Sequence, residues 1–300
     1  MLELIKQGTK FDFMGKAYIF FSISAFFIVI SLGLMFTKGF NYGIDFAGGT
    51  VFQVKFEKTP DLDTIRKVMN KIDVGEAIIQ NFGSDTDVLI RVEMTNKDLK
   101  KINESIEDGL TTEMKDNKFS IVRVEQVGPQ VGKDLKKMAF NAVIYSVIAV
   151  LIYVAIRFQF IFAAAAIIAL VHDVIITLGF FSLLGKEITI TVIAAVLTLV
   201  GYSLNDTIVI FDRIRETMRE DKEGKVPLKD LMNLSINETL SRTIITSFLT
   251  LLSVVALYFF GGEVINGFSF AMMIGIIVGS YSSIACASAI IYVIKKRNHI

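Results

Sequence analysis

Residues 188–211 read ITITVIAAVLTLVGYSLNDTIVIF, an apolar run in which Asp206 is the only charged residue. A helix of about 20 apolar residues is long enough to cross the hydrocarbon core of a bilayer. Asp206 stands in the second half of the run, where a charged side chain is costly unless a polar cavity or a partner receives it. The run therefore predicts a membrane-spanning helix that carries an ionisable group.

Further apolar runs of similar length lie on either side of this one. Together they predict an α-helical integral membrane protein with six transmembrane helices, at residues 17–36, 138–156, 160–184, 188–211, 243–260 and 268–294. The composition agrees with this class, because 53% of the 300 residues are apolar, whereas an ordinary soluble domain has about 45–50%. The modest size of this excess also predicts a sizeable soluble part.

The basic residues predict how the chain is oriented. Lysine and arginine concentrate in the cytoplasmic loops of membrane proteins, and here they gather at residues 1–16, 212–242 and 295–300. These three segments, which include both termini, are therefore expected in the cytoplasm, and residues 37–137 on the outer side. Long domains cross the membrane largely regardless of charge, so the lysines near the ends of 37–137 do not change this prediction.

Residues 37–137 contain the patterns of a small α+β domain. Alternating apolar and polar residues predict four strands, at 50–56, 77–80, 88–92 and 120–127. Helical spacing of apolar residues predicts one helix that starts at residues 59–61 and a second helix that carries Leu99 and Ile102, with Asn96 as its candidate cap. The resulting order is that of a ferredoxin-like domain. This fold hosts many unrelated functions, and nothing in the segment has the pattern of a catalytic site.

The residues around Asp206 indicate what this carboxylate does. Tyr202 lies one helical turn before it and Asn205 directly precedes it, so the segment is unusually polar for a membrane span. Arg242, at the start of the fifth span, is a candidate partner for an ion pair that breaks and reforms as Asp206 gains and loses a proton. The alternatives are that Asp206 reaches headgroup water and that Arg242 only anchors its helix at the cytoplasmic surface.

His172 and Asp173 stand near the middle of the third span. Ionisable residues at that depth are functional candidates by default, and a histidine titrates near neutral pH, which suits a proton relay. The same two residues can instead form a structural polar link between helices. The sequence leaves both interpretations open.

Small residues predict where helices pack closely. In the sixth span they recur at every fourth position, at Ala271, Gly275, Gly279, Ser283 and Ala287. Such a ridge predicts a tightly packed helix neighbour, in this chain or in a partner. Gly201 of the fourth span is expected to allow a close approach in the same way.

Several kinds of function are excluded or disfavoured. Cys286 is the single cysteine, which excludes an intrachain disulfide and a CxxC metal site, and the two histidines, His172 and His299, lie far apart in the sequence. The sequence has no phosphate-binding loop and no nucleophilic triad pattern, so we expect no enzymatic activity, no bound cofactor and no metal. A net charge of +1 gives no field that favours nucleic acid. The expected coupling ion is the proton, with sodium as the alternative.

Several segments resemble the SecF family of bacterial protein-export membrane proteins. Residues 43–50, GIDFAGGT, match the family signature G-x-D-F-x-G-G-T, whose defining positions here are Gly43, Asp45, Gly48 and Gly49. Further similar segments follow in the family's order, at 127–132, 172–174, 201–207, 212–216 and 241–243. The resemblance covers nearly the whole chain.

The resemblance implies a function beyond what the residues indicate by themselves. SecF pairs with SecD in the bacterial inner membrane to form a transporter unit of the RND superfamily. That unit joins the SecYEG channel, with YajC as a further partner, and uses the proton gradient to promote polypeptide export after the ATPase SecA has begun it. By motif match, Asp206 and Arg242 correspond to the family's proton-pathway residues. The outer domain would move with, or support, the larger outer domain of SecD.

Two other functions remain as alternatives. One is an RND-type proton-coupled exporter of lipids or small molecules that works as a dimer, which requires a second large outer domain that this chain lacks. The other is a passive scaffold of the translocon, in which Asp206→Asn would be harmless. A lone half of a repeat-built transporter would leave Asp206 facing lipid, so we expect an obligate partner or a homodimer.

Overall fold

The computed structural model describes residues 9–72, 74, 77–92, 99–221 and 225–298. The chain divides into two compact units. Met1–Asn41 and Phe140–Ile300 form the first, called here the membrane unit, and Tyr42–Ala139 form the second, called here the sheet domain. Helix α5 (Pro129–Arg157) begins in the sheet domain and continues into the membrane unit.

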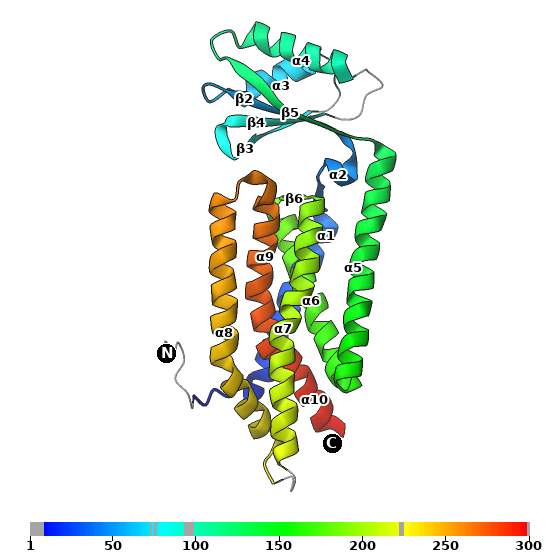
Figure 1. Ribbon diagram of the computed structural model, residues 1–300, viewed down its shortest axis with the longest axis vertical. Helices are drawn as coiled ribbons and strands as arrows, with labels where there is room; N and C mark the ends of the chain where they lie inside the picture. The colour runs from blue at the N-terminus through cyan, green and yellow to red at the C-terminus, as the bar shows by residue number, and fades with distance from the viewer. Residues whose placement is uncertain (1–8, 73, 75–76, 93–98, 222–224, 299–300) are drawn as a thin grey trace. The chain divides into compact units, whose positions relative to one another are not determined.

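Long helices make up the membrane unit (Figure 1). They are α1 (Ala17–Thr37), α5, α6 (Phe160–Leu184), α7 (Ile190–Glu220), α8 (Leu228–Phe260) and α9 (Glu263–Tyr281), which continues through the π-helix η2 (Ser282–Ala287) into α10 (Ser288–Asn298). The short 3₁₀ turn η1 (Met14–Lys16) precedes α1, and the short strand β6 (Glu187–Ile188) precedes α7. Six helical stretches of the described chain are long and apolar enough to cross a membrane, so the prediction of six membrane helices is confirmed.

The ends of these helices follow hydrogen bonding and not hydropathy. The third predicted span coincides with α6, at Phe160–Leu184. Helices α5, α7 and α8 extend beyond the predicted spans 138–156, 188–211 and 243–260, because helical hydrogen bonds continue through charged residues outside the apolar core. The sixth predicted span, 268–294, is not one regular helix, since the π-helix interrupts it.

Small residues allow the central helices to pack closely. Helix α9 packs against α6, α7 and α8. A Cβ atom added at Gly275 of α9 would lie 2.5 Å from a methyl carbon of Leu199 in α7, so no larger residue fits there without rearrangement. A Cβ at Gly179 of α6 would lie 2.3 Å from Ser31 Oγ of α1. The predicted close packing of the sixth span is therefore confirmed, with α7 of the same chain as a neighbour.

The opposite outcome holds for Gly201. Among the described residues, no atom of another helix comes within 4 Å of a Cβ added at this glycine, which lies on the exposed face of α7. The expected close approach at Gly201 is therefore wrong for this chain taken by itself. The reason is that α9 packs on the other face of α7, where Leu199 and Ser203 lie.

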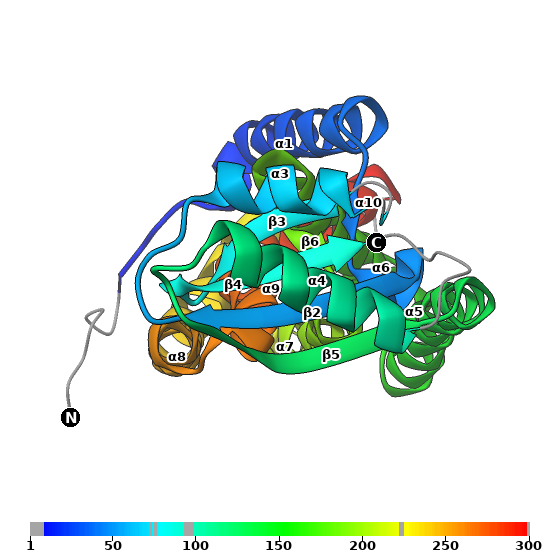
Figure 2. The same cartoon turned by 90° about the horizontal axis from the view of Figure 1, so that it is seen from above.

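The sheet domain has the predicted strand and helix order. Its elements are β1 (Asn41–Tyr42), α2 (Ile44–Ala47), β2 (Gly49–Phe56), α3 (Leu62–Lys71), β3 (Ala77–Phe82), β4 (Ser84–Val92), α4 (Leu99–Glu113) and β5 (Phe119–Val127). The four longer strands pair antiparallel in the order β3-β4-β2-β5, and α3 and α4 cover one face of this sheet (Figures 1 and 2). The predicted ferredoxin-like fold is confirmed.

Alternation along the strands produces the core of the sheet domain. Phe52 and Val54 of β2 point to the helix-covered face and are fully buried, where they meet Ile65 of α3 and Ile106 of α4. Asp61 caps α3, since its carboxylate accepts hydrogen bonds from the amides at the start of the helix. The predicted cap of α4, Asn96, lies outside the described residues.

Candidate functional site within the membrane helices

Two carboxylates are buried between the membrane helices. Asp206 of α7 is 2% exposed and Asp173 of α6 is 1% exposed. Both lie within membrane-spanning helices, where charged residues are rare because burial without a partner costs several kcal/mol. The contacts of each carboxylate therefore indicate what it can do.

Asp206 is held by a hydroxyl from the next helix. Ser247 of α8 donates a hydrogen bond from its Oγ to Asp206 Oδ2, over 2.8 Å. Ser247 is itself 6% exposed, so this contact lies inside the bundle. The structure thus places Asp206 between α7 and α8 and not in contact with the water at the end of α7. The expectation that a lone chain leaves Asp206 facing lipid is therefore wrong, because α8 of the same chain covers it.

Arg242 supplies positive charge near Asp206 without touching it. It lies on α8, more than one turn before Ser247, and its side chain is exposed. In the described part of the chain its guanidinium forms no direct ion pair with Asp206, although its charge acts on that carboxylate. The expected ion pair is therefore not formed in this structure, because Asp206 turns toward Ser247 and Arg242 turns outward.

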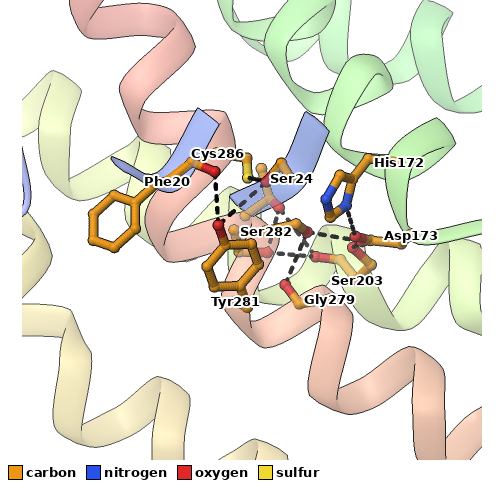
Figure 3. Close-up of polar contacts among 11 residues, drawn as sticks. Phe20, Ser24, His172, Asp173, Ser203, Gly279, Tyr281, Ser282 and Cys286 are labelled. Atoms are coloured by element: carbon orange, nitrogen blue, oxygen red, sulfur yellow. Dashed lines mark hydrogen bonds and ion pairs between the residues drawn. The ribbon is translucent and has the colours of Figure 1, made fainter. Parts of the chain in front are cut away.

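The second carboxylate, Asp173, accepts three hydrogen bonds (Figure 3). His172 Nδ1 lies 2.9 Å from Asp173 Oδ1. The hydroxyls of Ser203 in α7 and Ser282 in the π-helix donate to Asp173 Oδ2, over 2.7 and 2.8 Å. His172 is 5% exposed, and within the described residues its Nε2 atom has no hydrogen-bond partner. We call these four residues the Asp173 cluster.

A second set of polar contacts lies beside this cluster (Figure 3). Tyr281 packs its ring on His172, with 6.3 Å between the ring centroids, and donates its hydroxyl to Phe20 O of α1 over 2.9 Å. Ser24 of α1 contacts both the Tyr281 hydroxyl, at 3.2 Å, and Cys286 Sγ, at 2.9 Å. These contacts tie the π-helix region to α1.

Sequence reasoning found the two carboxylates but not the hydroxyls that hold them. Ser203, Ser247 and Ser282 stand among many small residues of the spans, and nothing in their spacing distinguishes them. Cys286, the single cysteine, is buried and contacts Ser24. The two residues predicted to support Asp206 lie in different surroundings. The Tyr202 hydroxyl is buried without a partner among the described atoms, and Asn205 is exposed.

The glycine motif that begins at Gly43 forms the single turn α2 in the sheet domain. Gly43 O accepts hydrogen bonds from the amides of Phe46 and Ala47, over 3.1 and 3.0 Å. Gly48 and Gly49 have φ angles of +75° and +121°, which L side chains rarely adopt. The two glycines therefore let the chain turn from α2 into β2.

This motif packs against the start of α5. A Cβ at Gly48 would lie 3.3 Å from Pro129 Cα, and a Cβ at Gly132 would lie 3.1 Å from Phe46 O. Asp45 lies in the same turn, in α2. The two segments that carry the family resemblance in this domain, 43–50 and 127–132, thus meet in a close backbone contact. This contact indicates a structural role for the glycines of both segments.

Charged residues cluster where α5 and α7 end. Arg157 and Arg215 both lie over the ring of Phe158, with 5.1 and 5.0 Å from guanidinium carbon to ring centroid. Asp212 lies 3.4 Å from Arg157 and 3.9 Å from Arg215. This arrangement joins the end of α5 to α7 through partly exposed charges, and ion pairs that water reaches contribute little to stability.

Six membrane helices, buried carboxylates between them and a ferredoxin-like domain after the first helix define a multi-pass membrane protein with ionisable residues inside its helix bundle. The chain belongs to the SecD/SecF family of protein-export membrane proteins. Residues 106–297 match the family model described as protein export membrane protein SecD/SecF, C-terminal, and residues 33–60 match the SecD/SecF GG motif. The resemblance to SecF is therefore confirmed.

Curated relatives match over nearly their full length. The chain is 57% identical to the protein translocase subunit SecF of Calditerrivibrio nitroreducens, over 98% of this chain and 97% of that protein. It is 46% identical to the protein translocase subunit SecF of Desulfurispirillum indicum, over 90% of this chain and 87% of that protein.

Solved structures agree with these relatives. The crystal structure of SecDF from Thermus thermophilus, described as a translocon-associated membrane protein, matches with a TM-score of 0.86 and 38% identity. A SecDF crystal structure in a super-membrane-facing form matches with a TM-score of 0.72 and 37% identity. These matches cover 97% and 99% of this chain but only 39% and 40% of the SecDF chains, so this chain corresponds to part of SecDF.

Proposed function

We propose that this chain, as an accessory subunit of the Sec translocase, works with SecD and uses the proton motive force to promote export of polypeptides through SecYEG. It acts without catalytic chemistry or a bound cofactor, and the proton is its coupling ion, with sodium as the alternative. It works in the bacterial inner membrane with both termini in the cytoplasm, and YajC is a further partner. The membrane fold and the family of the chain support this role.

The observation that carries the proposal is the environment of Asp206. A buried carboxylate whose contacts are the Ser247 and Thr246 hydroxyls of α8, with the charge of Arg242 acting from a distance, is incompletely compensated when it is ionised. Such a group can change protonation at modest cost when the helices around it move. Movement of α8 relative to α7 changes both contacts at once, because Ser247 and Arg242 lie on the same helix.

An exposed stripe of small and polar residues on α7 supports contact with a partner protein. Ala194, Thr198, Gly201 and Asn205 follow one another at helical spacing, and all four are exposed in this chain. Small and polar residues on one face of a membrane helix are typical of helix interfaces and not of lipid contacts. We therefore assign this stripe to the contact with SecD, which fits the fact that this chain spans 39% of a SecDF chain.

Reconstituted export tests the proposal. Asp206→Asn should abolish the part of export that depends on a proton gradient and leave gradient-independent export unchanged. Asp212→Asn is the matched control, because it makes the same change in the same helix at a side chain that is 46% exposed. Full gradient-driven export by Asp206→Asn would reject the proton role and leave the passive scaffold as the better interpretation.

The same system separates the coupling ions. With the proton gradient collapsed and a sodium gradient imposed, a proton-coupled chain should lose its stimulation of export. Stimulation that follows the sodium gradient would replace the proton by sodium in the proposal.

A further inference from the structure

The Asp173 cluster is a second buried ionisable site that shares no hydrogen-bonding residue with Asp206. Asp173 is held by His172, Ser203 and Ser282, from α6, α7 and the π-helix. Asp206 is held by Ser247 of α8. The two sites are separate because different residues hold the two carboxylates. They lie along one helix, α7, which contributes Ser203 to the first site and Asp206 to the second.

We propose that His172 and Asp173 form a second proton-binding site, distinct from Asp206, and that Ser282 links its occupancy to the π-helix. This inference rests on the proposed function only in that it assigns the site to the same proton-driven cycle. The binding of the proton itself can be measured without export.

The hydrogen bonds define how one proton is taken up. In the proton-free state, neutral His172 carries its proton on Nδ1 and donates it to Asp173 Oδ1, over 2.9 Å. A proton that binds at Nε2 allows the Nδ1 proton to pass to Oδ1. The product is a neutral imidazole with its proton on Nε2 and a neutral carboxylic acid, so uptake removes the net negative charge from the interior of the bundle.

His172 Nε2 is the atom at which this exchange occurs. It is buried, and within the described residues it has no hydrogen-bond partner. A buried polar atom without a partner is uncommon and calls for an explanation such as a functional role. An imidazole that uses one nitrogen to hold a carboxylate and leaves the other unpartnered has the arrangement of a proton relay.

The π-helix connects the protonation state of this site to the packing of the helices. Ser282, its first residue, donates its hydroxyl to Asp173 Oδ2 at 2.8 Å and lies 3.1 Å from Gly279 O. Single π turns inside α-helices are rare and are often found at functional sites. A hydrogen bond to an ionised carboxylate is roughly twice as strong as one to a neutral carboxyl group. Proton uptake therefore weakens the contact of Asp173 with Ser282, which holds the π turn against α6.

The other ionisable groups that face the pair come from the helix that contains the π turn. Tyr281 packs its ring on His172, and the charge of Asp173 acts on Cys286. Helix α1 contributes Ser24 and Phe20 O to this region, and α7 contributes Ser203, none of which is charged. Among the described residues, no lysine or arginine forms an ion pair with Asp173. The charge of the site is thus set by His172 and Asp173.

Infrared difference spectroscopy of the full chain in lipid nanodiscs tests the proposal. Spectra recorded at low and high pH reveal the carbonyl band of each carboxylic acid that takes up a proton. Wild type and Asp206→Asn should both contain a pH-dependent band that Asp173→Asn lacks. The loss of this band in Asp173→Asn and its retention in Asp206→Asn separate this inference from the proposed role of Asp206.

A second variant covers the case in which Asp173→Asn fails to fold. Ser282→Ala keeps the carboxyl group but removes one of its hydrogen-bond partners, so it should shift the frequency of the same band. A pH-dependent spectrum that neither variant alters would overturn the proposal, as would a band that responds to sodium and not to pH. Either result would leave the Asp173 cluster as a structural link between helices.

Discussion

At the scale of single residues, hydrogen-bond partners distinguish the two buried carboxylates. Among the described residues, Asp173 accepts three hydrogen bonds from three helical segments, whereas Asp206 is held by hydroxyls of α8, those of Ser247 and Thr246. The described contacts of Asp173 thus come from α6, α7 and the π-helix, whereas those of Asp206 come from α8. Movement of α8 relative to α7 is therefore enough to change the surroundings of Asp206.

Asp12, outside the membrane helices, allows a prediction from its pKa. Lys229 Nζ lies 2.7 Å from its carboxylate, and the Gly15 amide and the Asn233 side chain each donate a hydrogen bond over 2.8 Å. These contacts, the Lys229 hydrogen bond first among them, lower the pKa of Asp12 from 3.8 to about 2. They tie the segment before α1 to α8.

The lowered pKa of Asp12 sets the direction of the pH dependence. A group with a lowered pKa in the folded chain stabilises the fold above its unfolded pKa, and this contribution is lost as the pH falls through the folded pKa. The protection of the Gly15 amide, measured as its exchange rate relative to the intrinsic rate at the same pH, should therefore be high above pH 3.8 and fall as the pH falls toward about 2. Asp12→Asn should remove this acid-dependent change, and unchanged protection across that interval in wild type would contradict the prediction.

The residues that could be predicted from the sequence are those that conflict with their surroundings. Asp173 and Asp206 stand out because a carboxylate in an apolar run is costly to place in lipid. Ser203, Ser247 and Ser282 could not be found this way, because a serine is tolerated in membrane helices whether or not it binds a partner. Which hydroxyl meets which carboxylate depends on the packing of α6, α7, α8 and the π-helix.

At the scale of elements, hydropathy predicted the helices but not their irregularity. The apolar runs gave all six membrane helices, because lipid demands long apolar segments. The π-helix at Ser282–Ala287 is apolar and small like the residues around it, so no pattern marks it. It coincides with the point where Ser282 reaches Asp173, a contact between helices that periodicity within one helix does not encode.

The contact of α9 with α7 leads to a prediction about packing. Gly275→Val should destabilise the chain by about 1–3 kcal/mol, because overpacking a filled interior forces neighbouring side chains to move. The added Cβ alone would lie 2.5 Å from a methyl carbon of Leu199. Unfolding of the purified chain, followed by circular dichroism in a denaturing detergent, measures the effect.

Gly201→Val is the matched control for Gly275→Val. It makes the same change in α7, where no described atom lies within 4 Å of the added Cβ. The isolated chain should tolerate it with little change in unfolding. Equal destabilisation by both variants would mean that loss of glycine, and not packing against Leu199, determines the result.

At the scale of the whole molecule, the exposed faces of two membrane helices, α5 and α7, differ in their residue types. Helix α5 exposes large apolar side chains such as Tyr145 and Ile156, which suits lipid. The exposed stripe of α7, at Ala194, Thr198, Gly201 and Asn205, is small and polar. This difference between two exposed helices indicates that a protein partner, and not lipid, covers α7.

A bulky substitution on this stripe should separate the chain from SecD without unfolding it. Gly201→Leu places a side chain where the proposed partner helix approaches, and close approach of helices requires small residues at the contact. Co-purification with tagged SecD in mild detergent should fall at least about tenfold, which corresponds to about 1.4 kcal/mol of association free energy. Gly33→Leu is the matched control, since Gly33 is also exposed on a membrane helix, α1, with nothing described within 4 Å of its Cβ position. If both variants retain SecD equally, the partner binds another face of the membrane unit, and the assignment of this stripe to SecD is wrong.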